Sequence, residues 1–278
     1  MEVGIDKIFE YLSWDSNNEI QKRGIELASN INNLSVLIMP IENKSIWENC
    51  AKVLISKSDE ELELYFFELF EWLKDMNWPG AYLIYDRLIC VSTEKFLPAY
   101  QYSLSAAKQT EDRIWERALK DLFVEYVFRL IDWHMPDEIQ SKGISLARNI
   151  DTIVPFIQPL TPKHNINVWE NCAVIIAERS DKNLEPYLDS LLKWLEDPNR
   201  PGAFKILDRL KIFSGEKLKN PFMNRFTYAV NLDNEDGLKI IDYLSELLDN
   251  QELKATLPIS IIEKLQKHYK NWGFWYND

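Results

Sequence analysis

The chain has 278 residues, of which 46% are hydrophobic and 27% are charged, and its formal net charge is −12. This composition excludes wholesale disorder, and the negative charge argues against nucleic acid or an anionic membrane as a partner, because both would repel it. No stretch approaches the roughly 20 apolar residues of a membrane helix, and the first residues lack the apolar run of a signal peptide, so we expect a cytoplasmic protein.

From the N-terminus onward, apolar residues recur at helical spacing and strand patterns are nearly absent. The first half of the chain predicts helices near 5–14, 17–31, 34–39, 46–57, 59–75, 79–91, 94–107 and 111–132. Ser58 and Glu61 form the pattern of a capping box at the start of one of them. Pro79, like Pro201 in the second half, suits the first turn of a helix. We therefore predict an all-α fold.

The same unit occurs twice along the chain. Residues 47–88 and 169–210 align without a gap and are identical at 22 of 42 positions, and residues 14–37 match 133–156 at 10 of 24. A repeat of this length predicts a tandem, HEAT-like or α-solenoid architecture built from antiparallel helix pairs.

The join between the two units, near residues 120–133, is apolar at helical spacing, so we expect a helical junction there. The N-terminal unit is then 1–125 and the C-terminal unit 126–278, packed as one elongated body. The C-terminal aromatic residues are expected to cap the open end of the last unit: Trp272, Phe274, Trp275 and Tyr276.

A ten-residue signature occurs once in each unit. Residues 72–81 read WLKDMNWPGA, and residues 194–203 read WLEDPNRPGA, with Arg200 in place of the second Trp. This signature, in an acidic helical unit of this length, resembles that of an uncharacterised bacterial family whose members resemble HEAT-type repeats. The resemblance implies a helical fold and a bacterial source, and it implies no catalytic residues. Retention of Gly80 and Gly202 predicts close approach of the preceding Trp-bearing helix.

Sequence patterns of known enzyme chemistry are missing. The chain has no Gly-rich phosphate loop, no metal-binding His or Cys spacing and no nucleophile elbow. His134, His164 and His268 do not occupy equivalent positions in the two units. We therefore expect no enzymatic activity, no cofactor and no metal site. The three cysteines are expected to be small buried thiols: Cys50, Cys90 and Cys172.

One polar set occurs in both units. It comprises Glu48, Asn49, Asp75, Asn77, Asp86 and Arg87, matched by Glu170, Asn171, Asp197, Asn199, Asp208 and Arg209. One interpretation is a carboxylate-plus-arginine site with a general base; the other is a set of helix caps and pairs within the fold. The second is favoured because a fold needs identical copies and a catalytic centre rarely does. Both interpretations apply to Glu48, Asp75, Asp86 and Arg87, which could have a function in addition to a structural role.

The most informative difference between the units lies on the predicted helix 59–75. The face opposite its apolar stripe carries Glu60, Leu64, Phe67, Glu71 and Asp75, where the second unit has Lys182, Pro186, Asp189, Lys193 and Asp197. Large apolar side chains among carboxylates are typical of the centre and rim of a protein-binding site. Burial against a neighbouring helix would explain them equally well.

Three functions follow, in order of preference. The first is a non-enzymatic protein that binds a basic partner, most concretely a bacterial immunity protein that neutralises a toxin by occluding its surface. The second is an adaptor or scaffold that binds a peptide or an assembly subunit, and the third a helical-repeat enzyme acting on nucleic acid, which the charge disfavours. Residues 1–132 carry a net charge of −9 and 133–278 carry −3, so a basic partner would be steered toward the first half.

Overall fold

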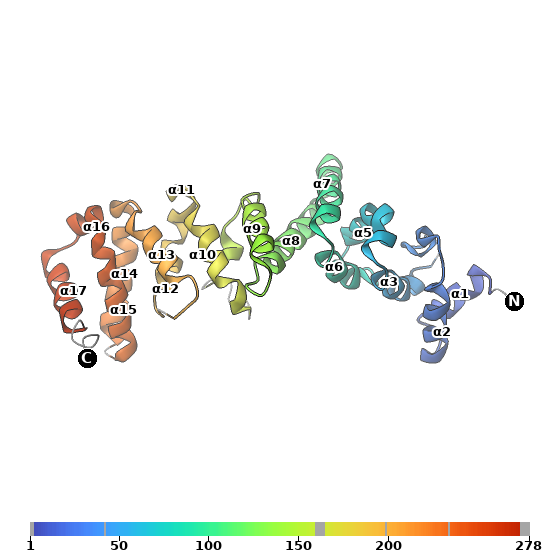
Figure 1. The fold of residues 1–278 in the computed structure, drawn as a ribbon, viewed down its shortest axis with the longest axis horizontal. Helices are drawn as coiled ribbons and strands as arrows, with labels where there is room; N and C mark the ends of the chain where they lie inside the picture. Colours follow the sequence, from blue (N-terminus) through green and yellow to red (C-terminus); the bar gives the residue numbers. More distant parts are fainter. Residues whose placement is uncertain (1–2, 42, 159–164, 198, 233, 273–278) are drawn as a thin grey trace. The chain divides into compact units, whose positions relative to one another are not determined.

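The structure is a computed structural model that describes residues 3–41, 43–158, 165–197, 199–232 and 234–272, with side chains considered up to residue 267. In this part of the chain the regular elements are α-helices and 3-10 turns and no strand occurs, so the predicted all-α fold is confirmed (Figure 1). The chain divides into two compact units, Met1–Tyr126 and Val127–Asp278. Among the described residues, no helix combines the length and the apolarity that crossing a bilayer requires.

The first unit begins with a short pair of helices and continues to a long helix that runs on into the second unit. Its helices are α1 (Ile5–Leu12), α2 (Asn18–Ala28), α3 (Trp47–Ile55), α4 (Asp59–Leu62), α5 (Phe66–Glu71), α6 (Ala81–Ile89), α7 (Thr93–Gln109) and α8 (Arg113–Leu130). The 3-10 turns between them are η1 (Leu34–Leu37), η2 (Lys44–Ile46), η3 (Glu63–Tyr65) and η4 (Trp72–Lys74).

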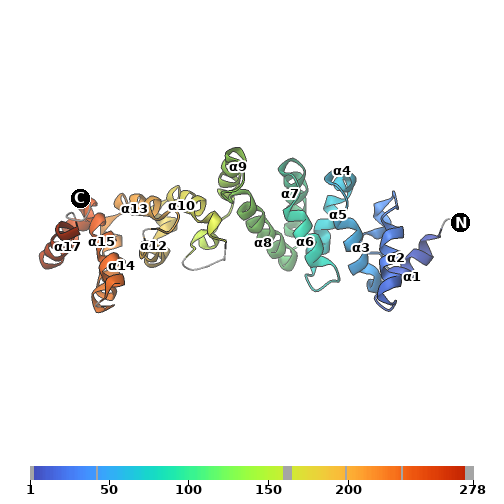
Figure 2. The same cartoon turned by 60° about the horizontal axis from the view of Figure 1, so that its bottom comes forward.

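The second unit repeats this order and ends in a group of packed helices in which α14 and α15 lie side by side (Figure 2). Its helices are α9 (Asp137–Ala147), α10 (Trp169–Ala177), α11 (Asp181–Leu184), α12 (Leu188–Trp194), α13 (Ala203–Lys211), α14 (Gly215–Leu232), α15 (Glu235–Glu246), α16 (Gln251–Thr256) and α17 (Ile259–Trp272). The 3-10 turns are η5 (Val154–Phe156), η6 (Ile166–Val168), η7 (Glu185–Tyr187) and η8 (Leu247–Asp249).

The two units match element by element. Helices α3 and α10, α4 and α11, α5 and α12, and α6 and α13 begin 122 residues apart in each case. The first Trp of the signature is fully buried in both, and its indole N–H donates to a proline carbonyl, from Trp72 to Pro79 at 3.0 Å and from Trp194 to Pro201 at 3.1 Å. A buried indole requires such an acceptor, so the repeated residues hold the core of each unit together.

The predicted helix 59–75 is wrong as one continuous helix. The segment changes from α4 to η3, then to α5 and η4, and Tyr65 leaves helical geometry with φ −117° and ψ 4°. The second unit breaks in the same way, and there Pro186 stands in η7, because proline removes a backbone donor that a continuous α-helix would use. The 3.6-residue spacing therefore cannot assign residues 60–75 to a single opposite face.

The turn before α6 depends on glycine. Gly80 has φ +83°, and a Cβ added to it would lie 2.5 Å from the Cβ of Ala51 in α3, the helix that begins with Trp47; Gly202 is alike, with φ +81°. The expected close approach is present, and the left-handed backbone is an additional reason for glycine. The placement of Pro79 in the first helical turn is wrong, because α6 begins at Ala81 and Pro79 lies in the preceding turn.

Two of the three cysteines are buried as expected. Burial raises the pKa of the Cys50 thiol to about 12 and also raises that of Cys172. Cys90 is exposed, so its predicted burial is wrong; it caps the end of α6, between Ile89 and the buried Val91, and its side chain faces outward. The predicted aromatic cap at Trp272, Phe274, Trp275 and Tyr276 lies outside the residues whose side chains are described.

Candidate functional site

The two apolar residues of the predicted binding face have different environments. Leu64, in η3, is 84% exposed. Phe67, in α5, is half-buried, and its ring centroid lies 4.7 Å from that of Tyr102 in α7 and 6.4 Å from that of Trp115 in α8. Packing against α7 and α8 therefore explains much of the need for an apolar residue at Phe67. No such packing covers the side chain of Leu64.

We give the name Leu64 patch to the exposed Leu64 together with Phe67, three residues later, and Tyr102, whose ring contacts that of Phe67. Tyr102 is 63% exposed and presents its ring beside that of Phe67. The comparison of the two units over residues 59–75 did not reach Tyr102. Extending it to residue 102 would have shown the same contrast, because the matching residue of the second unit is Asn224. The second unit carries Pro186, Asp189 and Asn224 at these positions, so the apolar patch belongs to the first unit only.

Carboxylates surround Leu64 along the chain. The Lys95 ammonium of α7 lies 3.1 Å from the Glu60 carboxylate and 3.2 Å from that of Glu63, and Glu60 remains largely exposed. The pKa of Glu60 is lowered by its own backbone N–H and by Lys95. The pKa of Glu61 is lowered by the Ser58 N–H, within the predicted capping box, and by Lys57. Glu60 and Glu61 are therefore anionic at neutral pH.

The remaining two residues of the predicted face have internal partners. Glu71 pairs with Lys74, whose ammonium lies 4.5 Å from the centre of the Trp115 ring. Asp75 accepts the backbone N–H of Asn77 at 2.9 Å and so forms a turn, which Asp197 and Asn199 repeat at 3.0 Å. A polar turn of this kind serves the fold. Glu60, Leu64 and Phe67 lie within eight consecutive residues of the chain, whereas Asp75 belongs to the turn.

The buried amide of the duplicated polar set forms the same bonds in both units. Asn49 donates to the Leu12 carbonyl at 2.7 Å and to Gln21 at 2.8 Å, while Asn171 donates to Ile131 and Gln140 at 2.8 and 2.6 Å. These bonds tie α3 to the end of α1 and to α2, and they tie α10 to the residue after α8 and to α9. They support the structural interpretation of the set.

The arginine of the set also repeats its contacts. Arg87 donates to the Lys57 carbonyl at 3.0 Å and to the Asp59 carboxylate at 2.6 Å, and Arg209 makes the matching bonds with Arg179 and Asp181. The exposed Asp86 joins no ion pair within the described residues. The six residues therefore do not converge on one site, and a general base with its substrate pocket is not assembled from them.

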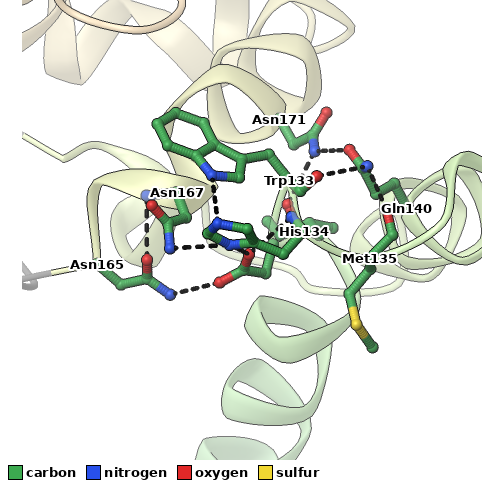
Figure 3. Close-up of polar contacts among 9 residues, drawn as sticks. Trp133, His134, Met135, Gln140, Asn165, Asn167 and Asn171 are labelled. Atoms are coloured by element: carbon green, nitrogen blue, oxygen red, sulfur yellow. Dashed lines mark hydrogen bonds and ion pairs between the residues drawn. The ribbon is translucent and has the colours of Figure 1, made fainter.

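A polar network that sequence reasoning passed over lies in the second unit, around His134 (Figure 3). Asp132 accepts the backbone N–H of His134 at 3.0 Å and approaches its Nδ1 at 2.8 Å, and the Asn165 amide donates to the same carboxylate at 3.0 Å. Burial would raise the pKa of Asp132, but the amide of Asn165 and the N–H groups of His134 outweigh it and lower that pKa. The network joins the loop after α8 to η6.

Both ring nitrogens of His134 have polar partners. Nδ1 lies 2.8 Å from the Asp132 carboxylate and 3.3 Å from the amide nitrogen of Asn167, and Nε2 accepts the indole N–H of Trp133 at 3.3 Å. In the first unit a bond between the hydroxyls of Ser13 and Ser45, 2.9 Å long, occupies the matching place. Nε2 already has a donor in the network, and among the described residues no group of three or more His, Cys, Asp or Glu side chains could hold a metal ion. Aligning residues 13–15 with 132–134 could have drawn attention to this histidine.

Comparison with known proteins finds a family model that matches part of the chain, and it gives no activity. The model of a family described as "Domain of unknown function (DUF5071)" matches residues 43–150. This stretch resembles an uncharacterised domain family. The expected resemblance to such a family is thereby confirmed over α3 to α9, which include the Leu64 patch. No curated protein and no solved structure matches the chain.

Proposed function

We propose that the protein is a non-enzymatic binding protein whose Leu64 patch holds a basic partner protein. The observation that carries the proposal is an 84% exposed leucine among carboxylates that are anionic at neutral pH. An apolar centre with a charged rim is the usual anatomy of a protein interface. The second unit supports the same reading by contrast, since Lys182 and Pro186 stand where the first unit has Glu60 and Leu64.

The most concrete form of this proposal is an immunity protein that neutralises a basic toxin by covering its surface in the cytoplasm. The net charge of −9 over residues 1–132 supports it, because opposite charge accelerates the encounter with a basic protein. A toxin that acts on nucleic acid must itself present a basic surface, and an acidic cover fits that surface. An adaptor that holds a peptide of an assembly would use the same patch with a different partner.

Capture of partners from the cytosol of the source cells tests the proposal. The bait is the full chain, compared with a Leu64→Asp bait and with a Pro186→Asp bait as the matched control from the second unit. We expect one basic protein to be retained by the wild-type and control baits and lost by Leu64→Asp. Recovery of the same proteins by all three baits would contradict the proposal. If the partner is toxic to cells, suppression of its toxicity by the purified chain establishes the immunity form.

A further inference from the structure

Three aromatic rings of the first unit fill the space between α5, α7 and the start of α8. Phe67 contacts Tyr102 and Trp115, and the Lys74 ammonium lies 4.5 Å from the Trp115 ring centre. Trp115 is 1% exposed, and its indole N–H donates to the carbonyl oxygen of Phe70 at 2.9 Å. The first unit therefore supplies its own aromatic filling at this place.

The second unit lacks all three rings. The residues 122 positions later are Asp189, Asn224 and Gly237. A Cβ on Gly237 would lie 2.4 Å from the carbonyl oxygen of Ala229, so α15 approaches α14 too closely for a side chain at this position. A hollow of about 520 Å³ is present where α12 faces α14, and its lining residues are Asp189, Lys193, Glu196, Asn224, Arg225 and Tyr228.

The lining contains one largely buried, ion-paired arginine and three polar side chains that form no hydrogen bond or ion pair with the rest of the described chain. The Arg225 side chain is only 10% exposed; it pairs with Glu196, and its guanidinium carbon lies 5.1 Å from the centre of the Tyr228 ring. The side chains of Asp189, Lys193 and Asn224 make no hydrogen bond or ion pair within the described part of the chain. Both signs of charge are present, so a purely anionic or purely cationic ligand would be attracted by one group and repelled by another.

We propose that this hollow binds an aromatic side chain of a polypeptide that carries a hydrogen-bond donor, a tryptophan or a tyrosine. The ring takes the space that the first unit fills with its own rings, and Arg225 offers a cation to its face. The carboxylate of Asp189 and the amide oxygen of Asn224 accept the indole N–H or the phenol O–H. The site goes beyond the proposed function, because it lies in the second unit and requires neither the Leu64 patch nor a basic partner.

Titration of the full-length protein with N-acetyl-L-tryptophanamide, followed by NMR, tests the site. We expect this probe and N-acetyl-L-tyrosinamide to bind saturably, and N-acetyl-L-leucinamide to bind at least about tenfold more weakly because it has no ring. The double replacement Asp189→Phe with Asn224→Tyr places two of the first unit's aromatic rings in the hollow. We expect it to lower the affinity for the tryptophan probe by at least about tenfold as well. Asp208→Asn, an exposed carboxylate of the same unit, is the control and should change nothing.

A second variant keeps the test decisive if the filled variant does not fold. Asp189→Ala leaves the space open and removes one acceptor, so it should weaken the tryptophan and tyrosine probes and leave N-acetyl-L-phenylalaninamide unchanged. Equal binding of the leucine and tryptophan probes would overturn the proposal. An Asp189→Ala variant that weakens all aromatic probes alike, or none of them, would overturn it as well.

Discussion

At the scale of single residues, Gly80 is required for two reasons, its backbone conformation and the space available for its side chain. The presence of a glycine in the sequence does not distinguish between them. The Gly80 backbone is left-handed, at φ +83°, and a Cβ would meet Ala51 at 2.5 Å. Sequence comparison predicted the close approach, since the glycine recurs in both units. It could not predict the positive φ angle, because that angle is imposed by the turn before α6. In this turn the backbone N–H of Ala81 donates to the carbonyl oxygen of Trp78 at 3.0 Å.

Replacing Gly80 by alanine should therefore destabilise the protein by about 2 kcal/mol, through backbone strain and the contact with Ala51. Gly4→Ala is the matched control, because nothing lies within 4 Å of a Cβ there. Urea unfolding of the two variants and the wild type measures the difference. A Gly80→Ala midpoint equal to that of the control would refute both the strain and the close contact.

The Asp59–Arg87 pair makes stability depend on pH. Burial would raise the pKa of Asp59, but the Ser92 N–H and the Arg87 guanidinium outweigh it and lower that pKa below its usual value. A lowered carboxyl pKa stabilises the folded state above the unfolded value of about 4, and this stabilisation is lost as the pH falls through the folded value.

Asp59→Asn should accordingly lower the free energy of unfolding at pH 7, and the difference from wild type should shrink below about pH 4. Chemical unfolding at a series of pH values measures this difference. Since the side chain of Asp59 is 20% exposed, we expect a moderate effect. A difference that stays constant from pH 7 to pH 3 would show that the carboxylate charge is irrelevant.

At the scale of elements, the segment 59–75 shows how far periodicity reaches. Most of the apolar positions expected to face the core are buried, among them Leu62, Leu69 and Trp72, each at 0% exposure, whereas Tyr65 is only half-buried. The break into short helices and 3-10 turns was not predictable from this stretch alone, because Leu64 is compatible with either geometry. Pro186 at the matching position was the available signal, since proline tolerates a 3-10 turn and not the interior of an α-helix.

Single replacements in the segment should separate surface from core. Leu64→Ser should change the free energy of unfolding by no more than about 0.5 kcal/mol, because the side chain is exposed. Phe67→Ala should cost about 1–2 kcal/mol, because its ring packs on Tyr102 and Trp115. Thermal unfolding of both variants measures the contrast. Equal destabilisation by the two would mean that Leu64 is core.

At the scale of the whole molecule, duplication is what made the fold predictable. Equivalent helices begin 122 residues apart, and the alignment that predicted this also supplied an internal control for the exposed residues that it pairs. The family model matches 43–150, a range that starts before α3 and crosses the boundary at Tyr126, so it does not coincide with either compact unit. Shifted by 122 residues, the same range is 165–272 and spans α10 to α17.

The parts of the sites that escaped sequence reasoning depend on contacts between distant helices. Tyr102 completes the Leu64 patch from α7, and the lost rings of the second unit leave a hollow only because α12 and α14 face each other there. His134 was set aside because its counterpart, Asp15, is not a histidine. Periodicity identifies the faces of one helix, but it does not identify which side chain of another helix meets them.

The most direct test of the central claim is the affinity of the captured basic partner for the wild-type chain and for Leu64→Asp. Because a truncated or charged hot spot loses about 2 kcal/mol or more, we predict at least that loss, with the thermal midpoint of the variant unchanged. We also predict that association with the wild type slows as salt is raised. Equal affinity of the two chains for the partner would contradict the account.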